Sequence, residues 1–128
     1  MKIFFDGGAA PNPGIRHCCI VVDGEILEET NLGYGSNNEA EWIGLLWAME
    51  TAHSRGATEV EIIGDSMLVV NQANGLWKIN KKEFFPFKVE ADRLRKLFKT
   101  CTIKQVGRDQ NKAGHQIEAT LKARPKKR

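Results

Sequence analysis

The sequence predicts one α/β domain built on a five-stranded mixed sheet flanked by helices. The first quarter of the chain holds three strand-like segments separated by turn residues, which is typical of antiparallel strands. Segments with helical periodicity then alternate with short β-branched segments, which favours parallel strands joined by helical crossovers. A length of 128 residues suits one domain of this kind.

The first three strands are predicted over residues 2–6, 16–22 and 25–34. Asp23-Gly24 separates the second from the third, and this dipeptide between apolar runs is a strong hairpin signal. The first strand runs directly into Asp6, whose carboxylate would be costly inside a sheet unless a basic side chain or a metal compensates its charge. Two glycines follow it, and these allow another backbone or a ligand to come close.

A helix is predicted over residues 38–53, followed by a fourth strand over residues 58–63. The helix carries one face at helical spacing, made of Trp42, Leu45, Leu46, Met49 and His53. Capping side chains precede it, and Gly56 ends it. Because a helix crosses over between them, the fourth strand should lie parallel to the first.

The remaining elements are a short helix that ends at Asn74-Gly75, a helix over residues 84–99, a fifth strand over 101–106 and a last helix capped by Asn111. We expect the catalytic domain to span residues 1–122 and residues 123–128 to form a basic tail. The tail and the lysines between residues 78 and 82 concentrate positive charge, which suits phosphate binding if the rest of the chain points to nucleic acid.

Composition favours an ordinary globular protein, with 41% hydrophobic and 27% charged residues. No apolar run has the length of a membrane span and no signal-peptide layout opens the chain, so we expect a cytoplasmic monomer without membrane contact. The three cysteines lack the spacing of a zinc site and are interpreted as small core residues.

Three carboxylates are placed so that they can converge. Asp6 ends the first strand, Asp65 follows the fourth, and Glu41 faces inward from the start of the intervening helix. If the two strands are neighbours, the three side chains meet at one edge of the sheet, where α/β folds commonly hold ligands. Close, unpaired carboxylates repel one another, and a hard divalent cation such as Mg²⁺ or Mn²⁺ removes that conflict.

Four segments, in order, resemble the successive motifs of type 1 ribonuclease H: FFDGGAAPNPG, SNNEAEWIGLLWAME, IIGDSMLVVNQANGLWKI and VGRDQNKAGH. The resemblance implies the family's five-stranded mixed sheet and cleavage of the RNA strand of RNA–DNA hybrids with two metal ions. Asp6 corresponds to the metal-bridging aspartate and Asp65 to the third carboxylate. Glu41, rather than Glu39, corresponds to the helix glutamate, because it lies three residues after Asn38, as in the family's Asn-Asn-x-x-Glu pattern.

The fourth ligand departs from the family pattern, because His115 stands where the pattern Asn-x-x-x-Asp has its aspartate. In the first interpretation, which we favour, His115 is a metal ligand. Mn²⁺ should then support more activity than Mg²⁺, and the second of the two ions should bind weakly in the absence of substrate. In the second, Glu118 or Asp109 supplies the missing carboxylate. In the third, the domain binds nucleic acid without cleaving it.

The resemblance also implies contacts with the substrate. Asn12, Asn37, Asn38 and Asn71 match positions that contact 2′-hydroxyls or base edges, Ser36 matches a position on a DNA phosphate, and Met67 matches one against the bases. Turn-forming and capping roles are the alternative for these polar residues. Trp77 could stack on the DNA strand or belong to the core. A hybrid- or double-stranded-RNA-binding module and a nuclease of broader substrate range remain alternative functions.

Overall fold

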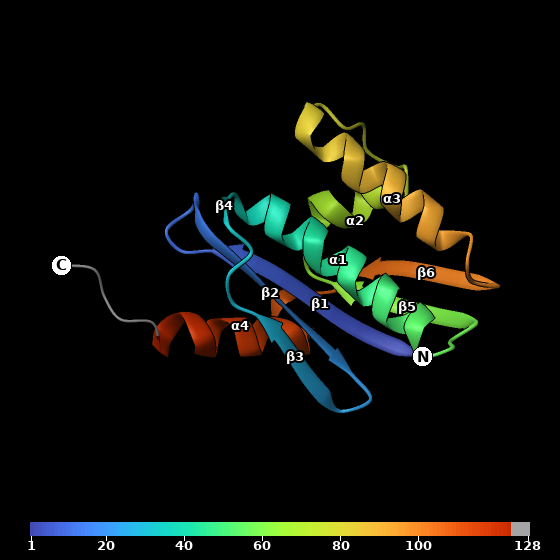
Figure 1. Ribbon diagram of the computed structural model, residues 1–128, viewed down its shortest axis with the longest axis horizontal. Helices are drawn as coiled ribbons and strands as arrows, with labels where there is room; N and C mark the ends of the chain where they lie inside the picture. The colour runs from blue at the N-terminus through green and yellow to red at the C-terminus, as the bar shows by residue number, and fades with distance from the viewer. Residues whose placement is uncertain (124–128) are drawn as a thin grey trace.

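The computed structural model describes residues 1–123, with side chains described as far as residue 120. The chain forms one sheet with helices α1, α2 and α3 on one face and α4 on the other (Figure 1). Most of the predicted basic tail, residues 124–128, lies outside the described residues. Within the described residues, no helix has both the length and the apolar character that crossing a membrane requires.

The five predicted strands are confirmed, in the order β3-β2-β1-β5-β6, and a sixth, two-residue strand pairs with β2. β2 is antiparallel to β1 and β3, whereas β1–β5 and β5–β6 are parallel. The strands are β1 Lys2–Ala9, β2 Gly14–Val22, β3 Glu25–Glu29, β4 Tyr34–Gly35, β5 Glu59–Gly64 and β6 Thr100–Gln105.

The predicted hairpin is confirmed, because Asp23 and Gly24 both adopt positive φ angles, 50° and 76°, as a tight two-residue turn requires. The predicted third strand, by contrast, is too long. It breaks into β3 and β4 because Gly33 takes a φ of 77° and its N–H bonds to the Asn31 side chain, which turns the chain away from the ladder.

The helices are α1 Asn37–Ser54, α2 Met67–Ala73, α3 Phe85–Arg95 and α4 Lys112–Ala123, with single 3₁₀ turns at Lys82–Phe84 and Arg108–Gln110. The helix predicted over residues 84–99 therefore ends early, at Arg95. Its last carbonyls bond three residues on, to the N–H groups of Leu97 and Phe98, and the chain then turns into β6. His53, expected on the inward face of α1, is exposed and lies edge-on to Phe98.

Two apolar clusters hold the layers together. The larger lies between the sheet and helices α1, α2 and α3, and includes Ile3, Phe5, Trp42 and Leu45. The smaller joins Cys19 and Val21 to Ala113 and Ile117 of α4 on the opposite face. Since successive strand residues point to opposite faces, β1 and β2 contribute to both clusters. The sheet is thus covered on both sides around β1, the strand that carries Asp6.

Candidate active site

The structure brings Asp6, Glu41 and Asp65 together as the sequence predicted. One carboxylate oxygen from each lies within 4.8 Å of the others, and all three side chains are half-buried. Asp6 lies in β1, Glu41 at the start of the second turn of α1, and Asp65 in the residue after β5. Glu39, the other glutamate at the start of α1, does not belong to this group. Its side chain accepts a hydrogen bond from Ser36 N.

Strand pairing accounts for the meeting of the two aspartates. β1 and β5 are parallel neighbours, with Phe4 opposite Ile63. Asp6 lies two residues after Phe4 within β1, and Asp65 lies two residues after Ile63, just past the end of β5, so the two carboxylates come level with each other at the carboxyl end of β5.

Two glycines bring Glu41 to the same place. A Cβ atom on Gly7 would lie 2.5 Å from Glu41 N and closer still to the Ala40 carbonyl, and one on Gly44 would lie 3.0 Å from the Asp6 carbonyl oxygen. The missing side chains let the backbone of α1 lie directly on β1. The glycine after Asp6 is therefore explained by close approach of the helix that carries Glu41.

The site is electrostatically strained in the metal-free protein. Burial, followed by the charges of Asp65 and Glu41, raises the pKa of Asp6 to about 8. Burial likewise raises the pKa of Glu41 to about 7, against a hydrogen bond with Ser66 that lowers it. The pKa of Asp65 is also raised by burial, although the Arg108 guanidinium opposes this shift. A divalent cation bound between such carboxylates would offset their repulsion and favour their ionised forms.

A hard cation fits these residues. The donor set is all carboxylate oxygen, which Mg²⁺ and Mn²⁺ prefer. Among the described residues, Asp65 Oδ2 is buried without a hydrogen bond, and the nearest cation recorded for it is Arg108, whose Nε lies 3.9 Å away. Arg108 is 81% exposed, so it lies at the solvent side of the group and leaves the buried oxygen available.

Stability of the metal-free protein should fall as the pH rises from about 5 to about 8. The pKa of Asp6 is about 8 in the folded protein, against 3.8 for the free side chain, so the folded state binds more protons than the unfolded chain over this range. Mn²⁺ or Mg²⁺ should therefore raise the melting temperature more at about pH 8 than at about pH 5. Thermal melts across this range, with and without metal, test this; a flat metal-free profile would contradict it.

The structure does not bring His115 into the carboxylate group. Its ring is exposed, and Nε2 lies 2.9 Å from the backbone oxygen of Asp109. Gly114 is the α4 residue that faces the carboxylates: a Cβ atom there would lie 3.3 Å from Asp6 Oδ2 and 3.6 Å from Asp65 Oδ2. The side of the site next to α4 is thus lined by a residue without a side chain.

Asn111 does more at this site than the capping role that the sequence predicts. Beyond capping α4 through Ala113 N, its fully buried side chain donates a hydrogen bond of 2.9 Å to the Phe5 carbonyl, beside Asp6. A hydrogen bond with Asn111 also lowers the pKa of Asp65. One amide therefore ties β1, α4 and a carboxylate together. Its signal in the sequence was only a cap-type residue at a helix start.

The residues matched to substrate contacts gather around the start of α1 and α2. Ser36 caps α1, and the Asn37 side chain accepts a hydrogen bond of 2.6 Å from Ala9 N. Asn12 accepts one of 3.0 Å from Asn37 N. Met67 is 53% exposed at the start of α2, and the Asn71 carbonyl accepts bonds from the segment that follows α2. Several of these side chains thus have structural partners as well as exposed surface.

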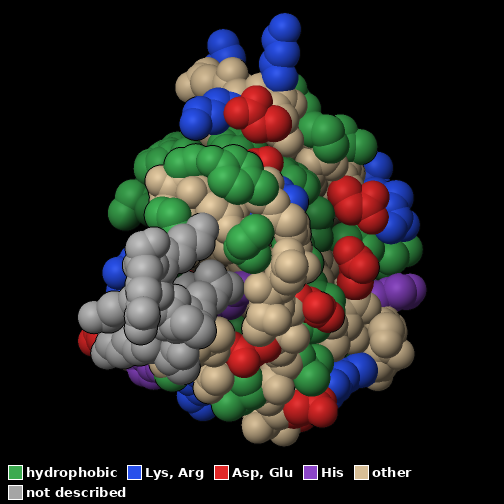
Figure 2. Space-filling model, turned by 60° about the vertical axis from the view of Figure 1, so that its left-hand side comes forward, with side chains coloured by type: hydrophobic (Ala, Val, Ile, Leu, Met, Phe, Trp, Pro, Cys, Tyr) green, Lys and Arg blue, Asp and Glu red, His purple; other side chains and the backbone are tan. Residues whose placement is uncertain are grey.

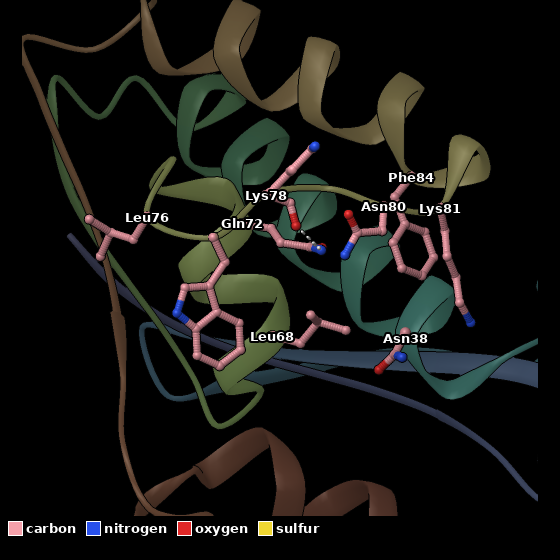
Figure 3. Close-up of a pocket in the computed structure, with 9 residues that line it drawn as sticks. Asn38, Leu68, Gln72, Leu76, Lys78, Asn80, Lys81 and Phe84 are labelled. Carbon is pink, nitrogen blue, oxygen red and sulfur yellow. Dashed lines mark hydrogen bonds between the residues drawn. The ribbon is translucent and has the colours of Figure 1, made fainter.

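A pocket of about 560 Å³ lies next to this region, between α1, α2 and the segment before α3 (Figure 3). Its lining includes Asn38, Leu68, Gln72, Trp77, Lys78 and Lys81. Trp77 is 44% exposed, which excludes the core role left open by the sequence.

Basic side chains project at the upper end of Figure 2, the end at which Figure 1 places the start of α3. Lys78 and Lys81 belong to the basic segment that the sequence singled out, whereas Gln72 had no such signal, and folding places them around the same pocket as Asn38.

The mixed sheet and its covering helices define the ribonuclease H class of fold. The structure aligns with crystallised RNase H1 from the archaeon Halobacterium salinarum, with a TM-score of 0.81 and 32% identity, over 95% of this chain and 98% of that one. It also aligns with LC11-RNase H1, crystallised with an RNA/DNA hybrid, with a TM-score of 0.79 and 26% identity over 94% and 98% of the two chains. The family model described as reverse transcriptase-like matches residues 11–118, and the chain belongs to this family.

The curated relatives that this chain matches are longer than it is. A bifunctional protein of Mycobacterium tuberculosis is 34% identical over 112 residues, which make up 83% of this chain and 31% of that protein. Ribonuclease HI of Halobacterium salinarum is 34% identical over 113 residues, 84% of this chain and 57% of that protein. The matched segments thus make up 31% and 57% of the length of these two relatives.

Proposed function

We propose that this chain is a metal-dependent endoribonuclease that hydrolyses the RNA strand of RNA–DNA hybrids, acting as a cytoplasmic monomer. The observation that carries the proposal is the grouping of Asp6, Glu41 and Asp65 at one edge of a ribonuclease H sheet. A relative of the same fold that was crystallised with an RNA/DNA hybrid supports the choice of substrate.

Asp6, Glu41 and Asp65 would hold two divalent ions, Mg²⁺ or Mn²⁺. When bound, such ions activate the attacking water and stabilise the leaving 3′-oxygen of a phosphodiester. Asp6 is the member whose pKa responds to both other carboxylates, which suits a shared, bridging role. Arg108, at the solvent side, helps to keep the three acids ionised and offers positive charge where a scissile phosphate would approach.

Substrate would lie across the starts of α1 and α2. The exposed surfaces of Asn12, Asn37, Asn38 and Asn71 would face the minor groove, where a 2′-hydroxyl distinguishes RNA from DNA. Ser36 would contact a DNA phosphate and Met67 the bases. The pocket beside Asn38 would take the DNA strand, with Trp77 offering a stacking surface and Lys78 and Lys81 neutralising phosphates.

Cleavage of labelled substrates in Mn²⁺ tests the proposal. RNA–DNA hybrid, double-stranded RNA and double-stranded DNA are compared side by side, with binding measured on the same samples. Products from the hybrid alone support the proposal, and products from double-stranded RNA as well indicate a broader nuclease. Binding of the hybrid without products would identify a binding module and overturn the enzymatic assignment.

We further propose that His115 completes the ligand set by turning away from the Asp109 carbonyl when an ion binds. Mn²⁺ should then support more activity than Mg²⁺, since imidazole nitrogen suits Mn²⁺ better. His115→Ala should raise the Mn²⁺ concentration needed for half-maximal activity about tenfold.

The alternatives for the fourth ligand are separated by matched variants. Metal titrations of His115→Ala are compared with those of Glu118→Gln and Asp109→Asn. An unchanged Mn²⁺ requirement in His115→Ala, with an increased one in either carboxylate variant, would assign the missing ligand to that carboxylate instead.

A further inference from the structure

We infer that Arg16 is a positioning residue, which acts through Glu39 to fix the first turn of α1 and the asparagines in it. This inference rests on the proposed function, because it concerns how substrate-contacting side chains are held. Arg16 lies in β2, more than twenty residues from that turn in the sequence, and no motif singled it out.

Arg16 links three segments of the chain. Its Nε and Nη2 donate hydrogen bonds of 3.1 and 2.6 Å to the Leu32 carbonyl, between β3 and β4. Its Nη1 lies 3.5 Å from Glu39 Oε2, and the two side chains are only 18% and 25% exposed. Partial burial shields this ion pair from solvent, so it constrains geometry more than a surface pair would.

Glu39 transmits this constraint to the helix start. Its carboxylate accepts a hydrogen bond of 2.9 Å from Ser36 N, and Glu39 N donates one of 3.2 Å to Ser36 Oγ. This reciprocal pair is a capping box, which fixes the chain's entry into the helix. Asn37 and Asn38 lie inside the segment that the capping box spans.

The space around the ion pair is closely filled. A Cβ atom on Gly35 would lie 2.6 Å from both Arg16 Cδ and Glu39 Oε1. Gly35 pairs with Gly14 of β2, so the strand edge lies directly against the two side chains. The backbone at Gly35 therefore packs against the Arg16 side chain and holds it between β2 and α1.

The ion pair should affect substrate binding more than chemistry. Glu41 is fixed separately, by the contacts of α1 with β1 at Gly7 and Gly44. Loosening the first turn would thus move Asn37 and Asn38 while leaving the three carboxylates in place. This separation predicts a change in KM with little change in kcat.

Steady-state kinetics on an RNA–DNA hybrid test the inference. Arg16→Gln should raise KM about fivefold, with kcat within about twofold of the parent value. The KM of Arg16→Lys should lie between those of the parent and Arg16→Gln, since lysine keeps the charge but cannot contact both Leu32 and Glu39. Arg55→Gln is the matched control: Arg55 pairs with Glu25 and Asp23 at the other end of α1, and its loss should leave KM unchanged.

The coupling between the two side chains gives a second readout. Glu39→Gln keeps a capping box but removes the charge, so the double variant with Arg16→Gln should have the KM of Arg16→Gln alone. Equal falls in kcat and kcat/KM, or a KM effect of the same size in Arg55→Gln, would overturn the inference. If the parent protein neither binds nor cleaves the hybrid, the proposed function fails instead, and that result is visible before any variant is made.

Discussion

Asp6→Asn is expected to abolish cleavage of an RNA–DNA hybrid, by at least about a thousandfold, while leaving the fold and hybrid binding intact. Asparagine keeps the shape of the side chain but removes the charge that a bridging ligand needs. Because burial and two neighbouring carboxylates raise the pKa of Asp6 to about 8, removing its charge should also raise the melting temperature of the metal-free protein at neutral pH and above.

The measurements are single-turnover cleavage, hybrid binding and thermal melting on the same preparation. Asp92→Asn is the control, because Asp92 is an exposed aspartate that pairs with Lys88 on α3, far along the chain from the acidic group. A variant Asp6→Asn that keeps more than about a tenth of the parent rate would rule out a ligand role for this residue.

Gly7→Ala is expected to destabilise the protein by about 3 kcal/mol or more, or to prevent folding. The added methyl group would overlap the Ala40 carbonyl and lie 2.5 Å from Glu41 N, and both are backbone atoms that cannot rotate away. Relief would require α1 to move off β1, and α1 carries Glu41 and much of the core.

The neighbouring glycine supplies the control. A methyl group on Gly8 would lie no closer than 3.7 Å to its nearest neighbour, Asn37 Oδ1, which is an ordinary contact. Gly8→Ala should therefore unfold in urea close to the parent midpoint. Equal midpoints for the two variants would mean that α1 does not lie on β1 as closely as described.

Much of the fold could be predicted because local signals agreed with one another. Asp23-Gly24 predicted the hairpin, and the spacing of Trp42, Leu45 and Leu46 predicted the inward face of α1. The prediction that the first strand ends at Asp6 was wrong, because β1 continues to Ala9. The predicted meeting of Asp6 and Asp65 still holds, since β1 and β5 are parallel neighbours and each aspartate follows the paired residues Phe4 and Ile63 by two positions. These features depend on the period of the pattern and on topology, which a sequence carries directly.

The remaining features depend on contacts between distant segments. The bond from Asn111 to the Phe5 carbonyl joins residues 106 positions apart, and no local pattern encodes it. The His115 ring lies against the backbone oxygen of Asp109 in the neighbouring 3₁₀ turn, and a side-chain rotamer of this kind leaves no trace in the sequence pattern. Arg16 reads in the sequence as an ordinary charged strand residue, and only folding shows that it links β2 to α1.

The hydrogen bond from Asn111 to the Phe5 carbonyl can form only late in synthesis of the chain. The amide that fixes β1 beside α4 is added only after more than a hundred residues have been translated, and α4 must still leave the ribosome before it can cover the second face of the sheet. A nascent chain would therefore contain Asp6, Glu41 and Asp65 before the residue that joins this group to α4 has been made, so the acidic group is ordered late.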